Sequence, residues 1–444
     1  MGMKHKTYPK YKDSGVEWLG KVPQHWETPL LKTCLKERNE SNKLGLVTDI
    51  LSLCMYRGVI PYSEKGNSGN KAKEDLTAYK IAKEGDIVLN SMNVIVGSVG
   101  LSKYTGVVSP VYYMLYPRYE NLSIKYYNYI FQNPSFQHNL SRLGSGILIK
   151  KSESSGKLNT IRMKIPMIKL NKEILPLPTP EEQVAIASFL DDKVGKVDEA
   201  IAQKEQLIEL LNERKQIIIQ NAVTKGLNPN APMKDSGIEW IGEVPEHWEV
   251  SRSQWLFGQR KEKCEPADEF LTASQKYGVI PQSLFMEKEG RRVMVVELNP
   301  SILKKARKGD FVISMRSFQG GLEFCEYNGA ISSAYVALFP LQSVSQNYFK
   351  YLFKSPRYIE ALGNTSNLVR DGQALRYDNF SMVDLPIVPL YEQEQIAEFV
   401  TSQILKTERL VKESNGIIKK LKEYKATLIN SAVTGKINVS QYGH

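Results

Sequence analysis

Histidine and cysteine are the residues of this sequence best suited to acid–base, nucleophilic or metal chemistry, and neither forms a reactive pattern. The four cysteines are Cys34, Cys54, Cys264 and Cys325. They are scattered, with no CxxC pair and no histidine at ligand spacing, which argues against a zinc site or a disulfide framework. His25 and His247 each precede a tryptophan and have no carboxylate or cysteine pattern nearby. We therefore interpret both histidines as packing or capping residues and not as catalytic bases.

Two segments match catalytic motifs only in part. GNSGNK at 66–71 lacks the spacing and the final Ser or Thr of a phosphate-binding loop. The segment Asn133-Pro134-Ser135-Phe136 is similar to an adenine-methyltransferase motif but lacks its second proline, and the other half of the chain has KSPR at 354–357. We interpret it as an ordinary helix interrupted by proline. The sequence therefore favours a binding function over a catalytic one.

The elements that carry these residues occur twice. KDSGVEWLGKVPQHWE at 12–27 recurs as KDSGIEWIGEVPEHWE at 234–249, with twelve of sixteen positions identical and an offset of 222 residues. Solenoid repeats have periods of about 20–50 residues, so this offset indicates a whole domain duplicated in tandem. The tryptophans of this motif (Trp18, Trp26, Trp240 and Trp248) are predicted to be core residues.

The two halves stay in step beyond this motif. YRGVIPYS at 56–63 matches YGVIPQS at 277–283, GDIVLN at 85–90 matches GDFVIS at 309–314, and 106–117 matches 329–340. These segments predict short strands, and the aromatic spacing at 125–136 and 346–358 predicts helices. In contrast, LGSGILIKKSESSGK at 143–157 has no close counterpart in LGNTSNLVRDGQAL at 362–375. One scaffold is thus expected to display two different surfaces.

Each half is predicted to end in a long helix. Thr179, Pro180 and Glu182 form a helix-start signal and capping box, and Gly226 is the predicted stop before the linker NPNAP at 228–232. The second helix is predicted from about Glu392 to Thr434. The predicted apolar stripes are Leu190, Val197, Ile201, Ile208, Leu211, Ile218 and Ala222 in the first helix and Leu410, Ile417, Leu421, Tyr424, Leu428 and Ala432 in the second. Such spacing favours a coiled coil over two helices that each pack only on their own domain.

The chain of 444 residues carries a net charge of +11. Residues 181–225 contribute −3 and residues 392–436 contribute +2, so the remainder carries +12. A basic excess outside the helices suggests a polyanion, with nucleic acid first among the candidates, although a basic protein without such a partner remains an alternative. The sequence shows no signal peptide and no stretch of about 18–20 apolar residues, so we expect a cytoplasmic protein with no membrane partner.

Taken in order, these segments resemble the specificity subunit of type I restriction–modification systems. The opening SGVEWLGKVPQHWE, the GDIVLN-type strand and the entry LPLPTPEEQVAIASFLD into the first long helix are patterns of that family. The entry recurs, weakened, as LPIVPLYEQEQIAEFV at 385–400, where Tyr391 replaces the Thr-Pro cap. The exits NAVTKGLN at 221–228 and SAVTGKIN at 431–438 match at an offset of 210. The resemblance covers nearly the whole chain, twice over.

The resemblance implies an α+β fold with two pseudo-twofold-related globular target-recognition domains joined by two long antiparallel coiled-coil helices. The expected boundaries are 1–178 and 231–388 for the two domains, 179–230 for the central spacer helix and 389–444 for the C-terminal one. Each domain would read one half of a bipartite, asymmetric double-stranded DNA target. The chain itself would hold no metal or cofactor and perform no chemistry. It would recruit two adenine methyltransferase subunits, and in the full enzyme nuclease/translocase subunits, and these partners would use S-adenosylmethionine, ATP and Mg²⁺.

DNA contacts are expected where the two halves differ, because arginine and glutamine read guanine and adenine edges bidentately. The candidates are Arg57, Arg142, Lys150, Lys151 and Arg162 in the first domain and Arg291, Arg292, Arg316, Gln319, Arg370, Gln373 and Arg376 in the second. Many such residues contact phosphate only, or solvent. Two alternatives stay open: a duplicated-domain nuclease or methyltransferase outside a restriction system, and a scaffold for another polyanion such as RNA.

Overall fold

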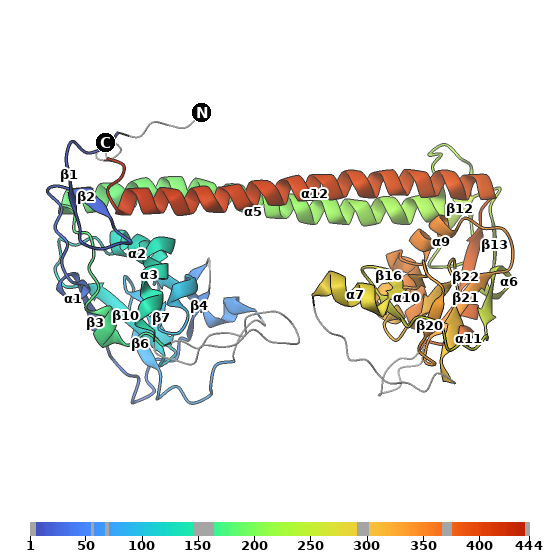
Figure 1. The fold of residues 1–444 in the computed structure, drawn as a ribbon, viewed down its shortest axis with the longest axis horizontal. Coiled ribbons are helices and arrows are strands. Elements are labelled where there is room, and N and C mark those ends of the chain that lie inside the picture. Colours follow the sequence, from blue (N-terminus) through green and yellow to red (C-terminus); the bar gives the residue numbers. More distant parts are fainter. Residues whose placement is uncertain are drawn as a thin grey trace. The chain divides into compact units, whose positions relative to one another are not determined.

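The computed structural model describes residues 6–54, 57–66, 71–144, 164–290, 302–365 and 375–439. These residues form two units. The first contains the described residues between 6 and 204 and residues 416–439, and the second contains residues 205–290, 302–365 and 375–415. Each unit therefore combines one globular domain with one end of each long helix (Figure 1).

The first globular domain is built around a four-stranded antiparallel sheet with the strand order β3-β10-β7-β8. Its strands are β3 (Leu35–Arg38), β7 (Ile87–Asn90), β8 (Val99–Leu101) and β10 (Tyr112–Pro117). Successive side chains of a strand point to opposite faces. Ile87 and Leu89 accordingly join one buried cluster, while Val88 and Met114 join another. The central strand is thus covered on both faces, which explains why GDIVLN is almost continuously apolar.

Smaller elements complete this domain. The two-stranded pairs are β1 (Tyr11–Asp13) with β2 (Lys21–Pro23), β4 (Leu51–Cys54) with β5 (Gly58–Pro61), and β6 (Lys80–Ala82) with β9 (Gly106–Val108). The helices are α1 (Leu31–Cys34), η1 (Tyr62–Lys65), η2 (Val94–Val96), α2 (Ile124–Gln132), α3 (Pro134–Leu140), η3 (Ser141–Leu143) and α4 (Met167–Leu170).

The second globular domain repeats this plan. Its four-stranded sheet has the order β14-β21-β18-β19, formed by β14 (Phe257–Arg260), β18 (Phe311–Ile313), β19 (Glu323–Phe324) and β21 (Val336–Pro340). Phe311 and Ile313 face one cluster and Val312 faces the other. The strands predicted from the shared segments, and the helices predicted from the aromatic spacing, are confirmed in both domains.

The remaining elements of the second domain are again short. The strand pairs are β11 (Met233–Asp235) with β12 (Glu243–Pro245), β13 (Glu249–Arg252) with β22 (Asp384–Ile387), β15 (Leu271–Ser274) with β16 (Gly278–Pro281), and β17 (Lys304–Ala306) with β20 (Gly329–Ile331). The helices are α6 (Ser253–Leu256), α7 (Gln282–Glu289), α8 (Ser317–Gly320), α9 (Gln346–Leu352), α10 (Pro356–Asn364) and α11 (Tyr377–Ser381).

The two long helices are α5 (Pro180–Lys225) and α12 (Leu390–Val433). The predicted capping box of α5 is confirmed, because Thr179 Oγ1 accepts from the Glu182 amide at 3.3 Å and Glu182 Oε2 accepts from the Thr179 amide at 3.1 Å. Gly226 follows α5 with φ +73° and Gly435 follows α12 with φ +71°, the left-handed geometry that ends many helices. Within the part of the chain that the structure describes, no helix is both long and apolar enough to cross a membrane.

Within each unit, the start of one long helix packs against the end of the other. In the first unit Leu190 of α5 and Leu428 of α12 share a core, and Lys425 Nζ lies 2.7 Å from Asp198 Oδ1. In the second unit Val223 of α5 and Val400 of α12 share a core. Since both clusters also contain residues of the adjacent globular domain, each helix end joins its partner helix and a domain. The predicted α+β class and antiparallel helix pairing are confirmed.

The apolar stripe predicted for α12 is wrong by one residue in its middle. Leu410, Ile417 and Tyr424 are exposed, whereas Ser414 and Ile418 are buried. A buried serine interrupts the apolar pattern, so the exposed leucine, isoleucine and tyrosine beside it simulate a stripe. The predicted ends of the stripe, Leu428 and Ala432, are buried as expected.

Candidate nucleic-acid interface

The repeated histidine–tryptophan motif anchors the helix starts. Trp26 Nε1 donates to Glu182 Oε2 at 3.1 Å, and His25 Nε2 lies 3.0 Å from the same carboxylate. In the second unit Trp248 Nε1 donates to a Glu392 oxygen at 3.0 Å, and His247 Nε2 lies 2.6 Å from the other oxygen. The interpretation as packing and capping residues is confirmed. The carboxylates come from more than 140 positions away, so sequence proximity could not reveal them.

The core prediction for the motif tryptophans holds with one exception. Trp18, Trp26 and Trp248 are buried, whereas Trp240 is partly buried and donates through Nε1 to the Asp384 carbonyl at 3.1 Å.

The partial methyltransferase motif is also structural. Asn133 caps α3, since its side-chain oxygen accepts from the Ser135 amide at 2.9 Å, and Pro134 is the first helical residue. The Asn133 amide group donates to Asn430 Oδ1 at 3.1 Å, and Phe136 is fully buried. The asparagine therefore links the domain to α12, and the predicted proline-interrupted helix is confirmed.

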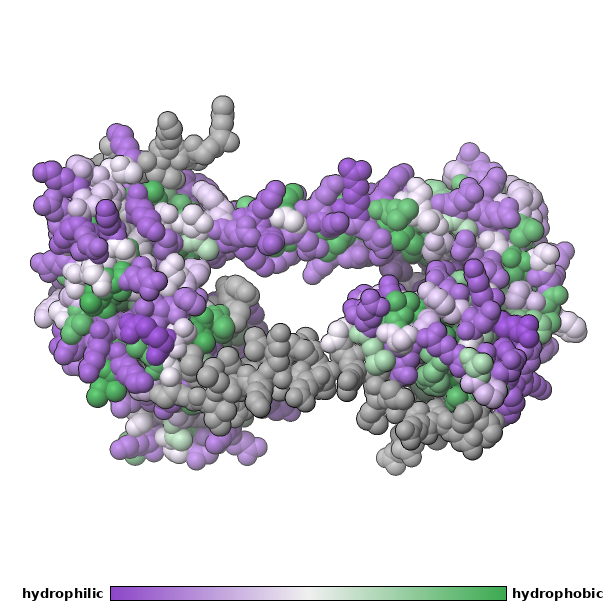
Figure 2. Space-filling model, in the orientation of Figure 1, coloured by the Kyte–Doolittle hydropathy of each residue, from purple (hydrophilic) through white to green (hydrophobic). Residues whose placement is uncertain are grey.

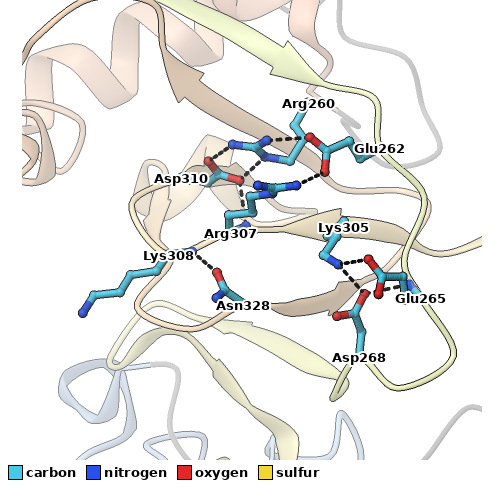
Figure 3. A network of polar contacts seen from close by, with 9 residues as sticks. All are labelled: Arg260, Glu262, Glu265, Asp268, Lys305, Arg307, Lys308, Asp310 and Asn328. Carbon is cyan, nitrogen blue, oxygen red and sulfur yellow. Dashed lines mark hydrogen bonds and ion pairs between the residues drawn. The ribbon is translucent and has the colours of Figure 1, made fainter.

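A matched ion pair supports the sheet in each domain. Arg260 Nε and Nη2 donate to the two oxygens of Asp310 at 2.7 and 2.8 Å, as Figure 3 shows. In the first domain Arg38 contacts Asp86 in the same way, at 2.8 and 3.2 Å. Hydrogen bonding to Asp310 raises the pKa of Arg260. Because both aspartates are almost fully buried, these arginines belong to the shared framework and not to a DNA-reading surface.

The surrounding cations of the second domain are largely neutralised as well. Arg307 Nη2 lies 2.8 Å from Glu262, and Lys305 Nζ lies 2.6 Å from Glu265 and 3.3 Å from Asp268. Lys308 is different: its backbone amide donates to Asn328, but its side chain points away from the network (Figure 3). Among the described residues no carboxylate pairs with it. Lys308 is therefore the basic side chain of this network whose positive charge is not neutralised by a described carboxylate.

Five of the twelve predicted DNA-contacting residues lie in the described chain, and all five are exposed, although two carry acidic partners. Arg57 donates to the carboxylate and the carbonyl of Glu64 at 3.1 and 3.0 Å. Arg142 contacts both oxygens of the buried Glu173 at 2.7 Å, which occupies much of its guanidinium. The residues outside the described ranges are Lys150, Lys151, Arg162, Arg291, Arg292, Arg370 and Gln373. A DNA contact by any of the twelve stays a prediction.

The structure brings two predicted residues together at α8 of the second domain. Arg316 immediately precedes this helix and Gln319 lies within it, and both are exposed. Burial raises the pKa of the nearby Tyr335, and the positive charge of Arg316 opposes this. The remaining described candidate, Arg376, is exposed at the start of α11, where its amide donates to Asn379 at 2.9 Å. Of the five predicted residues that the structure describes, Arg316 and Gln319 are thus the two that one element brings together.

The β15–β16 turn adds residues that the sequence reasoning missed. Lys276 Nζ lies 4.7 Å from the centre of the Tyr277 ring and 3.3 Å from Glu289, and the Tyr277 hydroxyl donates to Glu289 at 3.0 Å. Tyr277 precedes Gly278 as Arg57 precedes Gly58 in the first domain. A difference inside an otherwise shared segment was the available signal. Each domain thus presents a different side chain, held by a glutamate, from the same turn.

Lys304, on β17, is a further cation of the second domain. Its ammonium donates to the Tyr335 carbonyl at 2.8 Å, whereas the matching Lys80 donates to the Tyr112 carbonyl at 3.3 Å and also lies 3.8 Å from Glu37. Burial, together with the nearby Lys263, lowers the pKa of Lys304.

A large apolar binding surface would require hydrophobic side chains gathered on one face, and a metal site would require a group of possible metal ligands. On the face drawn in Figure 2, hydrophilic side chains dominate and hydrophobic ones are scattered in small areas. Across the described ranges, no group of three or more His, Cys, Asp or Glu side chains is arranged to hold a metal ion.

Comparison with known proteins identifies the fold. No protein-family model matches the sequence, and no curated protein matches it. The HsdS subunit from Thermoanaerobacter tengcongensis is 15% identical, with coverage of 94% of this chain and 98% of that chain and a TM-score of 0.48. The type I restriction–modification S subunit from M. genitalium is 15% identical, with coverage of 92% and 96% and a TM-score of 0.34.

A third solved structure comes from work on complex assembly and conformational transition of the type I R-M system. It is 15% identical to this chain, covers 93% of this chain and 98% of its own, and has a TM-score of 0.59. The shared fold therefore extends over nearly the whole of both chains.

Proposed function

We propose that this chain is the DNA sequence-specificity subunit of a type I restriction–modification enzyme. One observation carries the proposal: two domains share a framework down to its buried ion pairs, but differ in their exposed turns, within a fold shared with a chain of a type I R-M system. A duplicated catalytic domain would be expected to repeat its reactive residues. Duplicated reading domains instead need the same support and different contacts.

Each domain would read its own half of a bipartite double-stranded target. In the second domain Arg316 and Gln319 have the side chains that pair bidentately with guanine and adenine. Lys308 and Lys304 would contact phosphates, which position a protein on DNA without reading sequence. In the first domain Arg57 would contact the DNA. The β4–β5 turn presents its side chain, and Glu64 holds it.

Catalysis would belong to partner subunits. Two adenine methyltransferase subunits, with S-adenosylmethionine, would modify the target, and nuclease/translocase subunits would use ATP and Mg²⁺. The long helices supply exposed apolar residues for docking, including Val184 and Leu210 on α5 and Leu405 on α12. A cytoplasmic location follows from this proposal.

Selection from a random duplex library tests the function. The full chain, purified with the proteins that accompany it, should enrich duplexes with two short defined sequences separated by an undefined gap. Mass measurement of the complex should give one copy of this chain with two methyltransferase subunits. Binding should weaken steeply with salt, because phosphate contacts release counterions.

Three results would contradict the proposal. Enrichment of single-stranded RNA over duplex DNA would favour an RNA scaffold. Methylation or cleavage by this chain alone would favour a duplicated-domain enzyme. A one-to-one complex would remove the argument for two docking sites.

A further inference from the structure

An ion pair between a partly exposed lysine and a buried glutamate lies beside α8 in the second domain. Lys354, in the turn between α9 and α10, donates from Nζ to Glu323 Oε1 at 2.6 Å and to the Gly320 carbonyl at 2.9 Å. Glu323 is only 2% exposed. Its second oxygen is buried and has no hydrogen-bond partner among the described residues. Lys354 therefore provides both the charge balance of Glu323 and a hydrogen bond to the last residue of α8.

The first domain has no equivalent of this pair. In the register of the sheets, Glu323 lies opposite Val312 as Gly100 lies opposite Val88. Lys354 precedes the Ser355-Pro356 helix start as Gln132 precedes Asn133-Pro134. A glycine and a glutamine cannot form an ion pair. The pair thus belongs to the part of the second domain that differs from the first.

Close contacts make α8 dependent on its surroundings. Gly321 has φ +72°, and a Cβ there would overlap the Phe353 carbonyl oxygen, so the backbone after α8 is pressed against the end of α9. A Cβ at Gly320 would meet the Gln275 side chain of the β15–β16 turn. Movement of the Gly320 carbonyl would therefore shift both α8 and its contact with this turn.

We propose that Glu323 and Lys354 are positioning residues that determine the half-site read by the second domain without contacting DNA. The pair holds the Gly320 carbonyl, and α8 in turn holds Arg316 and Gln319 at the angle that bidentate base contacts require. This inference rests on the proposed function. Burial raises the pKa of the Glu323 carboxyl, and the charge and hydrogen bond of Lys354 oppose this rise. The carboxylate thus depends on the lysine that also holds α8.

Two variants separate positioning from folding. Lys354→Gln removes the charge and leaves Glu323 unbalanced, which puts folding at risk. The double variant E323Q/K354M removes both charges, and replacing a buried ion pair as a unit is far less destabilising than breaking it. Lys350→Met is the matched control, because Lys350 on α9 pairs with Glu326 at 3.5 Å, both side chains are half-exposed, and the other described contact of Lys350 is with the Phe324 ring of β19. Lys354→Arg retains the charge and should keep the parental preference.

The measurement is selection of bound duplexes from a random library by the full chain and its accompanying proteins, with circular dichroism to verify folding. The folded double variant should lose about tenfold in discrimination at the second half-site, the equivalent of one bidentate contact. The first half-site and the gap should stay unchanged, and K350M should match the parent. Amide hydrogen exchange at Gly320 and Gly321 should be faster in the double variant.

Unchanged half-site preferences in the folded double variant would overturn the positioning role, as would equal losses at both half-sites. If the double variant does not fold, K354R decides the question. A tenfold loss of discrimination at the second half-site in K354R, which keeps the charge, would also contradict the positioning role. Failure of the parent chain to enrich any duplex would instead refute the proposed function.

Discussion

At the residue scale, the basic side chains of this protein divide into neutralised and free ones. Arg260 and Arg38 are held by buried aspartates in matching positions, whereas Lys308 extends from the same network without a carboxylate partner among the described residues. A net positive charge therefore does not identify which cations bind a polyanion. The ion pairs within each domain show which cations are already neutralised and which are left for a polyanion.

Replacing Arg260 should destabilise the second unit strongly. R260M would leave Asp310, with a side chain 3% exposed, as an uncompensated buried charge, at a cost of about 3–5 kcal/mol in the free energy of unfolding. K308M is the control and should change stability by less than about 0.5 kcal/mol, while weakening DNA binding and its salt dependence. Urea unfolding gives the first quantity and binding at several salt concentrations the second. Equal stability of the two variants would contradict the framework role of Arg260.

Glu392 predicts a pH dependence of stability. Burial alone would raise the pKa of Glu392, but hydrogen bonds from Trp248 and His247 lower it below its ordinary value of 4.5. The folded state then binds fewer protons than the unfolded state, so this stabilisation is complete above about pH 4.5 and is lost as pH falls through the folded pKa. E392Q should therefore cost about 1–2 kcal/mol at pH 7 and progressively less in acid.

Denaturant unfolding of the parent and E392Q between pH 3 and 7 measures this difference. Glu394→Gln, on the exposed side of the same helix start, is the control. A constant difference across the pH range would show that the carboxylate charge is not what stabilises the helix start.

At the element scale, the helix ends differ in how much they tolerate. Gly226 and Gly435 both have positive φ, so alanine should cost about 1–2 kcal/mol at either position. A methyl group at Gly226 would lie 3.3 Å from Trp248, whereas one at Gly435 would overlap Pro23. G435A should therefore be the more destabilising by about 1–3 kcal/mol in thermal or denaturant unfolding. G195A, inside α5 with open space around the added methyl, should gain up to about 1 kcal/mol.

Local elements could be predicted from the sequence because their signals are local. The GDIVLN strand and the Thr179 cap depend on residues within a few positions, and both are confirmed. The predicted apolar stripe of α12 is wrong in its middle because Ser414 interrupts the apolar pattern of the buried face. The exposed Ile417 lies only one position from the buried Ile418. The side-chain contacts around α8 and the β15–β16 turn could not be predicted. Tyr277 is held by Glu289, and Lys354 is paired with Glu323. The fold brings these partners together, so the sequence contains no spacing pattern that could predict the contacts.

At the scale of the whole molecule, specificity should be divisible. Replacing residues 231–388 by the corresponding domain of a relative should change one part of the bipartite target and leave the other part as it was. The physical reason is that the two cores share no globular element and meet their helices separately. Sequence selection with the parent and the exchanged chain measures this. A change in both parts would show that the domains do not read independently.

Because both units use parts of α5 and α12, the two units should complete their folding in a fixed order during synthesis on the ribosome. The described residues of the second unit all lie between positions 205 and 415, so this unit can fold as soon as that stretch has emerged. The first unit lacks Leu428, Ile429, Ala432 and Val433 of its core until the last part of α12 has been made. At about 5–20 residues per second, synthesis of the intervening stretch takes roughly 10–45 s. For that time the core around Trp26 and Tyr126 lacks the apolar side chains of α12, so we expect the nascent amino-terminal half to bind chaperones.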